Sequence, residues 1–470
     1  MKTETIVQKI WSLCHILRGD GVSYHEYISE LTYLLFLKIA KENKSEENLP
    51  KGYRWDNLVN YQGDDLLSFY REMLTYLGGH ASTEKVRKIY AFPTTVFSHS
   101  ENLSAVIQGI ARLDWNYLGK DRMGEVYEGL LAKNSQDSRS GAGQYFTPRP
   151  LVDCMVALLR PKPGEIIQDP AMGTGGFLIS ANDCLRRHAS AKAYAKEPPK
   201  YEGIEIEKGT YRIALMNSFL HDLDSKLILG DALTKDAEQL SPADVVLANP
   251  PFGNKAGSAR AQREDIPVPT SNKQLAFLQH IQLSLKPGGR AAVVLPDNVL
   301  FEGGAGRKIR QKLMSECQLH TVLRLPTGIF YSPGVQTNVL FFNRCKPGEP
   351  GTEEIWFYDL RHDMPRFGRT RPLADNDFKQ FVEAFGDNPN GLAARSEEGF
   401  DGRWKRFSRA EIAERQDNLN PSWMGEETGH LEHLLEPDEI AAALLTHLRA
   451  AVSEIESLAS DFIEVDEPSK

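Results

Sequence analysis

The sequence lacks the cysteine and histidine patterns that bind metals in proteins. Its five cysteines are widely spaced, no two of them have C-x-x-C spacing, and no H-E-x-x-H motif occurs. Metal catalysis therefore has no support in the sequence. Scattered cysteines, odd in number, also give no disulfide framework, so we expect a reduced, cytoplasmic location.

Long apolar runs and a positive net charge are absent too. No stretch approaches the roughly 20 apolar residues that cross a bilayer, and the charged start MKTETIVQKIWSLCHILRGDG does not resemble a signal peptide. We therefore expect no membrane partner. The net charge of −9 is unusual for a protein that binds DNA by itself through many phosphate contacts. If DNA is the substrate, the positive surface is local or belongs to a partner.

The 470 residues are enough for two or three domains, and the pattern changes twice along the chain. Residues 1–138 are predicted to form a helical N-terminal domain, in which Ser23 and Glu26 make a capping-box pattern. Nothing in this domain resembles a catalytic constellation. Residues 139–430 begin in a polar linker and are expected to form the catalytic domain. Residues 431–470 are predicted to contain a C-terminal helix.

The catalytic domain has the sequence pattern of an α/β fold. Short β-rich runs alternate with helical stretches, which predicts a doubly wound, parallel, Rossmann-like sheet. The runs are EIIQD (165–169), YEGIEI (201–206), KLILGD (226–231), DVVLAN (244–249) and AAVVLP (291–296). From 346 to 430 the pattern weakens. Because ligands bind at the carboxyl edge of such sheets, the residues that follow each run are the candidates for function.

A glycine-rich loop follows the first of these runs, in the segment DPAMGTGGFL (169–178). It lacks the Walker motif, and a leucine replaces the third glycine of a dinucleotide-binding loop. Glycine lets the backbone approach a ligand closely, so Asp169, Gly173, Thr174 and Gly175 are candidates for cofactor binding. The alternative is a tight turn whose glycines only supply positive φ.

Acidic residues end the next two runs. Glu205 lies where a ribose-binding carboxylate is expected after the glycines, with Glu207 on the same side of the strand as its competitor. Asp231 is placed to accept a hydrogen bond from an adenine amino group. Its alternative role is a helix N-cap, and the sequence does not separate the two.

The fourth run ends in Asn249-Pro250-Pro251-Phe252. Two consecutive prolines cannot donate backbone hydrogen bonds, so neither strand nor helix continues through them. Together with the upstream glycine loop, this motif resembles the amino-methyltransferases that methylate exocyclic amines of DNA bases. The resemblance implies S-adenosyl-L-methionine as the cofactor and residues 249–252 as the catalytic motif.

The chemistry of that family suits these residues. The lone pair of an exocyclic amine is delocalised into the base, which makes the amine a poor nucleophile. The side-chain oxygen of Asn249 and the carbonyl of Pro250 can accept hydrogen bonds from the two N–H groups of the amine and thereby aim its lone pair at the methyl group. Phe252 offers a ring face on which a flipped base can stack. The asparagine form resembles adenine-N6 enzymes more than cytosine-N4 enzymes. No cysteine follows a proline, which argues against cytosine-C5 methylation.

A second segment of the family lies upstream, in QYFTPRP (144–150). The resemblance places it over the cofactor. Its candidates for cofactor binding are Gln144, Tyr145, Phe146, Thr147, Pro148 and Arg149. Thr147 is expected as the N-cap of the following helix and Pro148 as its first residue, and a plain helix start is the alternative.

The whole chain resembles the modification (M) subunit of type I restriction-modification systems, which are N6-adenine DNA methyltransferases. The match includes the helical N-terminal domain, the order of the motifs, GVQTNVLFF (334–342) and RFGRT (366–370). It implies double-stranded DNA as substrate and, as partners, a specificity (S) subunit, a second M subunit and a restriction (R) subunit. The alternatives are an inactive methyltransferase-fold scaffold and an RNA or protein amide methyltransferase.

The acidic net charge of the chain favours DNA recognition by a separate subunit. Only about forty residues separate Asn249 from the next strand, which is too few for a target-recognition domain. Lys255, Arg260 and Arg263 in this stretch either touch phosphates or belong to a solvated loop.

The C-terminal helix is predicted from Pro437 to about Phe462. Its apolar face consists of Ile440, Leu444, Leu448, Val452, Ile455, Leu458 and Phe462. We expect this face to dock a partner subunit; packing against its own domain is the alternative.

Overall fold

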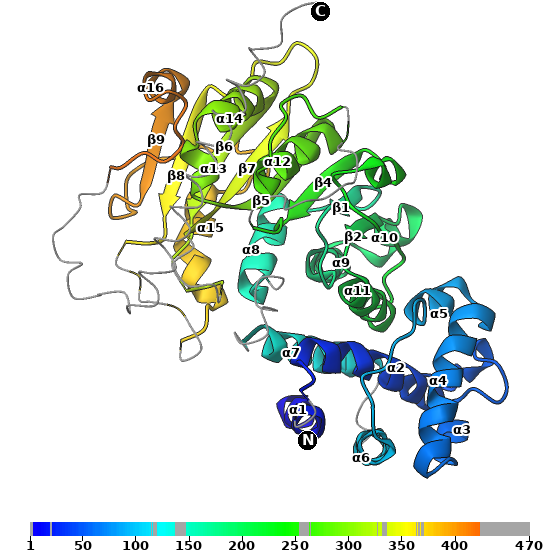
Figure 1. Ribbon diagram of the computed structural model, residues 1–470. Coiled ribbons are helices and arrows are strands. Elements are labelled where there is room, and N and C mark those ends of the chain that lie inside the picture. The colour runs from blue at the N-terminus through cyan, green and yellow to red at the C-terminus, as the bar shows by residue number, and fades with distance from the viewer. Residues whose placement is uncertain are drawn as a thin grey trace, which may run out of the picture.

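The computed structural model describes residues 3–18, 21–113, 115, 120–136, 147–252, 263, 265–326, 328–330, 336–362, 364, 367 and 371–423 (Figure 1). The N-terminal part is helical, as predicted. It contains α1 (Thr3–Arg18), α2 (Tyr24–Glu42), the 3-10 turn η1 (Glu46–Asn48), α3 (Trp55–Val59), α4 (Gly63–His80), α5 (Glu84–Ile89), α6 (Ser100–Ala111) and α7 (Lys120–Gln136). Among the described residues, no helix combines the length and apolar character that crossing a membrane requires.

The capping box predicted for α2 is confirmed. Ser23 Oγ accepts from the backbone N–H of Glu26 at 3.3 Å, and the Glu26 carboxylate accepts from the N–H of Ser23 at 2.9 Å. Two donors at the helix start are thereby satisfied. Helix α7 packs on α2, where the hydroxyl oxygens of Thr32 and Tyr127 lie 2.6 Å apart.

In the rest of the described chain, helices flank a nine-stranded sheet with the spatial order β3-β2-β1-β4-β5-β7-β6-β8-β9. The strands are β1 (Ile166–Asp169), β2 (Lys200–Glu205), β3 (Ser225–Leu229), β4 (Ala243–Ala248), β5 (Leu285–Pro296), β6 (Cys317–Arg324), β7 (Thr337–Arg344), β8 (Glu354–Asp359) and β9 (Trp404–Ser408). The strands from β3 to β5 in this order are parallel, as predicted.

Helices cover both faces of the sheet, which confirms the doubly wound fold. Along β4, Val245 belongs to the same core as α8 (Arg149–Leu159), α9 (Gly176–His188) and α11 (Lys208–Leu220), whereas Val246 belongs to the core with α12 (Lys273–Ser284) and α14 (Gly304–Glu316). This alternation follows from the two-residue period of a strand. The remaining elements are α10 (Ala191–Lys196), η4 (Lys235–Gln239), α13 (Asn298–Phe301), η5 (Asp375–Phe378), α15 (Lys379–Phe385) and α16 (Arg409–Glu414).

The second half of the sheet is not predicted by the sequence pattern. β7 is antiparallel to both β5 and β6, and β9 is antiparallel to β8. Because β7 runs against its neighbours, the connection from β6 to β7 begins and ends at the carboxyl edge of the parallel strands. That is the edge where β4 ends next to Asn249.

A buried arginine joins the N-terminal helices to the sheet part. Arg212 of α11 donates to the carbonyl of Ile89 at 3.0 Å, to Ser29 Oγ at 2.8 Å and to the carbonyl of Ala91 at 3.3 Å. Its guanidinium also lies 4.4 Å from the centre of the Tyr33 ring. A buried guanidinium is stable only with such partners, so these contacts fix α11 against the helical part.

Candidate active site

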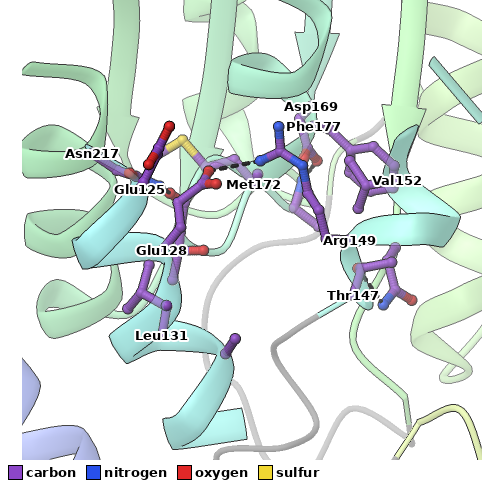
Figure 2. A pocket seen from close by; sticks show the side chains of 16 residues that line it. Glu125, Glu128, Leu131, Thr147, Arg149, Val152, Asp169, Met172, Phe177 and Asn217 are labelled. Carbon is purple, nitrogen blue, oxygen red and sulfur yellow. Dashed lines mark hydrogen bonds and ion pairs between the residues drawn. The ribbon is translucent and has the colours of Figure 1, made fainter. Parts of the chain in front are cut away.

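A cavity of about 310 Å³ opens at the carboxyl edge of the sheet, beside the ends of β1 and β4 (Figure 2). Its lining comes from two parts of the chain. Asp169, Thr174 and Asn249 belong to the sheet part, and helix α7 of the N-terminal part contributes another wall. The cavity therefore brings together the glycine loop and Asn249, the first residue of the Asn-Pro-Pro-Phe motif.

The glycine loop turns sharply between β1 and α9. Gly173 has a φ of +53° and Gly175, the N-cap of α9, has a φ of +84°. Side chains strain such a backbone, so the turn itself requires glycine, which is the alternative that the sequence left open. The same turn also faces the cavity, because Thr174 and Gly176 line it. Asn217 of α11 holds the loop by donating from Nδ2 to the carbonyl of Thr174 at 3.1 Å.

Two of the acidic candidates are buried next to this loop. Asp169 is 1% exposed, accepts from the N–H of Ala171 at 3.0 Å and has its pKa raised to about 8 by burial. Glu205 is 8% exposed, accepts from the N–H of Gly173 at 3.0 Å and has its pKa raised to about 7 by burial. Carboxyl groups with such raised pKa values are concentrated at functional sites.

The other acidic residues have local backbone partners. Glu207, the competitor of Glu205, is the N-cap of α11. Asp231 accepts from the N–H of Leu233 at 2.9 Å, and the N-cap of the following turn η4 is Thr234. Asp231 is thus not a helix N-cap. Glu205, Glu207 and Asp231 are all outside the lining of the cavity, and of the acidic candidates only Asp169 lines it.

Asn249 follows β4 directly, and its amide is fixed in one orientation. Nδ2 donates to Thr147 Oγ1 at 3.0 Å, while Oδ1 is buried and has no hydrogen-bond partner in the described part of the chain. A buried acceptor left unpaired costs about 1–3 kcal/mol. Such an atom in the lining of a cavity indicates a place where a ligand can donate a hydrogen bond.

The rest of the motif is held by its neighbours. The carbonyl of Pro251 accepts from Gln274 Nε2 at 2.9 Å. The ring of Phe252 meets the ring of Phe330 edge to face, with 6.1 Å between the ring centres. Phe330 lies in the connection between β6 and β7, so the unpredicted half of the sheet supports the motif.

The prediction for the start of α8 is wrong by one residue. The N-cap is Pro148 and the helix begins at Arg149. Thr147 does not cap the helix, and its hydroxyl oxygen accepts a hydrogen bond from Asn249 Nδ2. A residue proposed for a local role therefore contacts the motif at the end of β4.

Arg149 lines the cavity and is shared among three carboxylates. Its guanidinium nitrogens lie 2.7 Å from Glu128 Oε1, 3.0 Å from Asp153 Oδ1 and 3.3 Å from Asp183 Oδ2. Figure 2 shows the ion pair with Glu128. These partners neutralise the guanidinium and tie α7 to α8. Direct contact between Arg149 and a cofactor stays a prediction.

Sequence reasoning missed the wall that α7 supplies. Its lining residues are Glu125, Glu128, Gly129, Leu131 and Ala132. Glu125, Glu128, Gly129 and Ala132 have the spacing i, i+3, i+4 and i+7, which places them on one helix face. This spacing predicts that the residues share one helix face, but it does not predict which part of the molecule that face contacts.

Some candidates lie outside the described residues: Gln144, Tyr145, Phe146, Lys255, Arg260 and the C-terminal helix. Arg263, considered for phosphate contact, is paired with Asp265 at 2.5 Å. Among the described residues, no group of three or more His, Cys, Asp or Glu side chains could hold a metal ion.

Comparison with known proteins gives the family. Residues 118–430 match the model for N-6 DNA methylases, and residues 6–110 match the HsdM N-terminal domain. The chain is also 41% identical to the type I restriction enzyme EcoKI methylase subunit of Escherichia coli (strain K12), over 99% of this chain and 97% of that protein. The chain belongs to the type I restriction enzyme methylase subunits.

Other relatives agree with this membership. The StySPI methylase subunit of Salmonella potsdam is 41% identical over the same shares of the two chains. Among solved structures, one describing assembly and conformational transition of the type I R-M system covers 100% of both chains with a TM-score of 0.74 and 28% identity. The crystal structure of the EcoKI M protein covers 99% of this chain and 97% of that chain, with a TM-score of 0.56 and 36% identity.

The family and fold expected from the sequence are thereby confirmed, and the methyl donor of this methylase subunit is S-adenosylmethionine. The cavity suits that cofactor. Its sulfonium and ammonium groups are positively charged, and Glu125, Glu128 and Asp169 bring carboxyl groups to the lining. Asn249, whose side-chain oxygen is buried and unpaired in the described chain, lines the same cavity.

Proposed function

We propose that this methylase subunit methylates N6 of adenine in double-stranded DNA, at sites chosen by a partner subunit. The observation that carries the proposal is the side-chain oxygen of Asn249. It is buried, lines the cavity beside the glycine loop and has no hydrogen-bond partner in the described chain. A neutral acceptor in this place suits an uncharged N–H donor, which is what an exocyclic amine provides.

Asn249 and Pro250 act on the amine. Asn249 Oδ1 accepts a hydrogen bond from one N–H group of the amine. The direction of Oδ1 is set because Nδ2 donates to Thr147. The carbonyl of Pro250 accepts the other N–H bond, with its direction set by the rigid proline backbone. Both bonds draw the amine nitrogen toward tetrahedral geometry and aim its lone pair. The bound cofactor would supply an electrophilic methyl group and leave as S-adenosylhomocysteine, and the methylated amine would then lose one proton.

Phe252 offers its ring as a stacking surface for the flipped adenine. The edge-to-face contact with Phe330 limits the orientations of that ring. Stacking of a base on an aromatic side chain contributes roughly 1–3 kcal/mol.

The cofactor is proposed to lie along the carboxyl edge of the sheet. Asp169, Gly173, Thr174 and Gly175 would surround its amino-acid end, and Glu205 would accept from the ribose hydroxyls. The contact between Glu205 and the N–H of Gly173 supports this set, since it places the carboxylate against the loop. Asp231 would bind the adenine amino group, and residues 144–149 would cover the cofactor.

The subunit is proposed to work in an assembly. Its relatives are named as subunits of type I restriction enzymes, which supports partnership with an S subunit, a second M subunit and an R subunit. The net charge of −9 supports a separate DNA reader. Residues 1–138 and 139–430 remain our proposed domains, with 431–470 as the docking tail, and the cytoplasm is the expected location of an enzyme that acts on the cell's DNA.

Methyl transfer in vitro tests the proposal. The subunit is purified with its co-expressed S subunit and given duplex DNA and labelled S-adenosylmethionine, and the nucleosides are then separated. We expect label on N6-methyladenine, dependent on the S subunit. Label on N4-methylcytosine would contradict the choice of base. Label on RNA or protein, or cofactor binding without any transfer, would favour the alternative functions.

A further inference from the structure

One end of the cavity, between α7 and α11, has no assigned role. Asn217 of α11 and Glu125 of α7 both line the cavity, and the two helices pack against each other; both side chains are labelled in Figure 2. Asn217 is 1% exposed, and its Oδ1 is buried without a hydrogen-bond partner in the described residues. Its Nδ2 is bonded to the carbonyl of Thr174 at 3.1 Å, so the amide cannot flip without losing that bond. The orientation of Oδ1 is therefore set.

The charge of the cavity favours a positively charged ligand group at this end. Glu125, Glu128 and Asp169 line the cavity, whereas Arg149 is the one cationic side chain among its described lining residues. Arg149 already has three carboxylate partners. Glu125 and Glu128 together outweigh Arg149, so the lining is negative even with Asp169 protonated.

We propose that Asn217 and Glu125 bind the ammonium group at the amino-acid end of S-adenosylmethionine. An ammonium group has three N–H donors and no acceptor, so it is matched by a fixed carbonyl oxygen and a carboxylate. Glu128 is a positioning residue, because its bond to Arg149 holds α7 at the cavity. This assignment deepens the proposed function and rests on it.

The assignment gives the N-terminal helices a part in cofactor binding. Helix α7 meets the sheet part closely at Gly124, where an added Cβ would lie 2.8 Å from His221 Nε2. Its other side packs on α2 through Tyr127 and Thr32. The ammonium site is complete only while α7 is seated in this way.

The test compares three ligands by calorimetry on the full chain. S-adenosylmethionine and S-adenosylhomocysteine carry the ammonium group, and 5′-methylthioadenosine lacks the amino-acid end. We expect Glu125→Gln and Asn217→Ala each to weaken binding of the first two by about tenfold, the scale of one charge-assisted hydrogen bond. Binding of 5′-methylthioadenosine should stay at the wild-type value. Glu47→Gln, at an exposed residue of the N-terminal part, is the control and should change no affinity.

Two results would overturn the assignment. One is wild-type affinity for S-adenosylmethionine in both variants, and the other is an equal loss for all three ligands, which indicates a general disturbance of the cavity. Glu125 is exposed, so Glu125→Gln keeps the test decisive even if the Asn217 variant does not fold. If the wild-type protein binds none of the three ligands, the proposed function fails instead.

Discussion

The bond between Asn249 and Thr147 decides which atom of the amide faces the cavity. Thr147 accepts the hydrogen bond from Nδ2, and the unpaired Oδ1 is the atom that we propose to accept from the base amine. Asn249→Ala should slow methyl transfer by about 2–4 kcal/mol, the scale of one preorganised transition-state partner. Cofactor affinity should be unchanged. Single-turnover kinetics measure the first effect and calorimetry the second. Asn249→Asp keeps an acceptor and is the matched control, and a wild-type rate in the alanine variant would reduce Asn249 to a turn residue.

The pKa of Glu205 gives a second prediction for a single residue. Burial raises this pKa to about 7, so the free protein holds the carboxyl group mostly protonated below pH 7 and ionised above it. Ribose hydroxyls donate more strongly to the ionised form. Affinity for 5′-methylthioadenosine should therefore rise as the pH increases through 7 and then level off. Titrations across this range check the profile. Glu205→Gln should flatten it, and an unchanged profile in that variant would assign the titration to another group.

Among the elements, the first turn of α9 offers a glycine at which a substitution can test cofactor binding without straining the backbone. Gly175 has a φ of +84°, whereas Gly176 has an ordinary φ, and a Cβ added there meets no atom within 4 Å. Gly176 lines the cavity. Gly176→Asp should fold, since an acidic residue suits the first turn of a helix. It should weaken S-adenosylmethionine binding by more than about tenfold, because the new carboxylate occupies the cavity.

Calorimetry and thermal denaturation measure the two effects of Gly176→Asp. Gly176→Ala is the control for volume and should bind more tightly than the aspartate variant. If the aspartate variant is folded and binds the cofactor like the wild type, the cofactor does not approach the start of α9.

The elements also show what the sequence can and cannot predict. The parallel strands were predictable because each apolar run is followed by turn-forming residues. β7 was not, since its segment TNVLFF is buried on both faces and carries no alternation. Asp169 and Asn249 could be placed together because parallel strands end at one edge. The hydrogen bond between Thr147 and Asn249 could not be predicted. The two residues are 102 positions apart in the sequence, and capping rules consider only neighbouring residues.

For the whole molecule, the amphipathic C-terminal segment sets the prediction on assembly. The described chain ends at Trp423, whose Nε1 donates to the carbonyl of Gly402 at 2.8 Å and whose ring lies 5.2 Å from the guanidinium of Arg324. The chain is thus anchored to the sheet part before the predicted helix begins. Truncation after Glu436 should leave a folded, cofactor-binding monomer that no longer copurifies with an S subunit, because an apolar helix face is the typical core of such an interface.

One preparation of the truncated protein is tested in three ways. Copurification measures binding to the S subunit, calorimetry measures cofactor affinity, and a methylation assay measures activity on DNA that carries the recognition site. Full-length protein carried through the same steps is the control. An unfolded truncated protein would mean that the helix packs on its own domain, and normal assembly would mean that another surface holds the S subunit.

The reversed direction of β7 has a consequence for how such enzymes diverge. The connection that carries Phe330 is fastened at both ends to adjacent strands of one sheet and opens beside Phe252. Residues can be inserted, deleted or exchanged within it without changing the order of the strands or the glycine loop. Under the proposed stacking role of Phe252, changes in this connection would alter the surroundings of the target base while Asn249 and the glycine loop stay the same. It is therefore the first segment to randomise in a search for a new base preference.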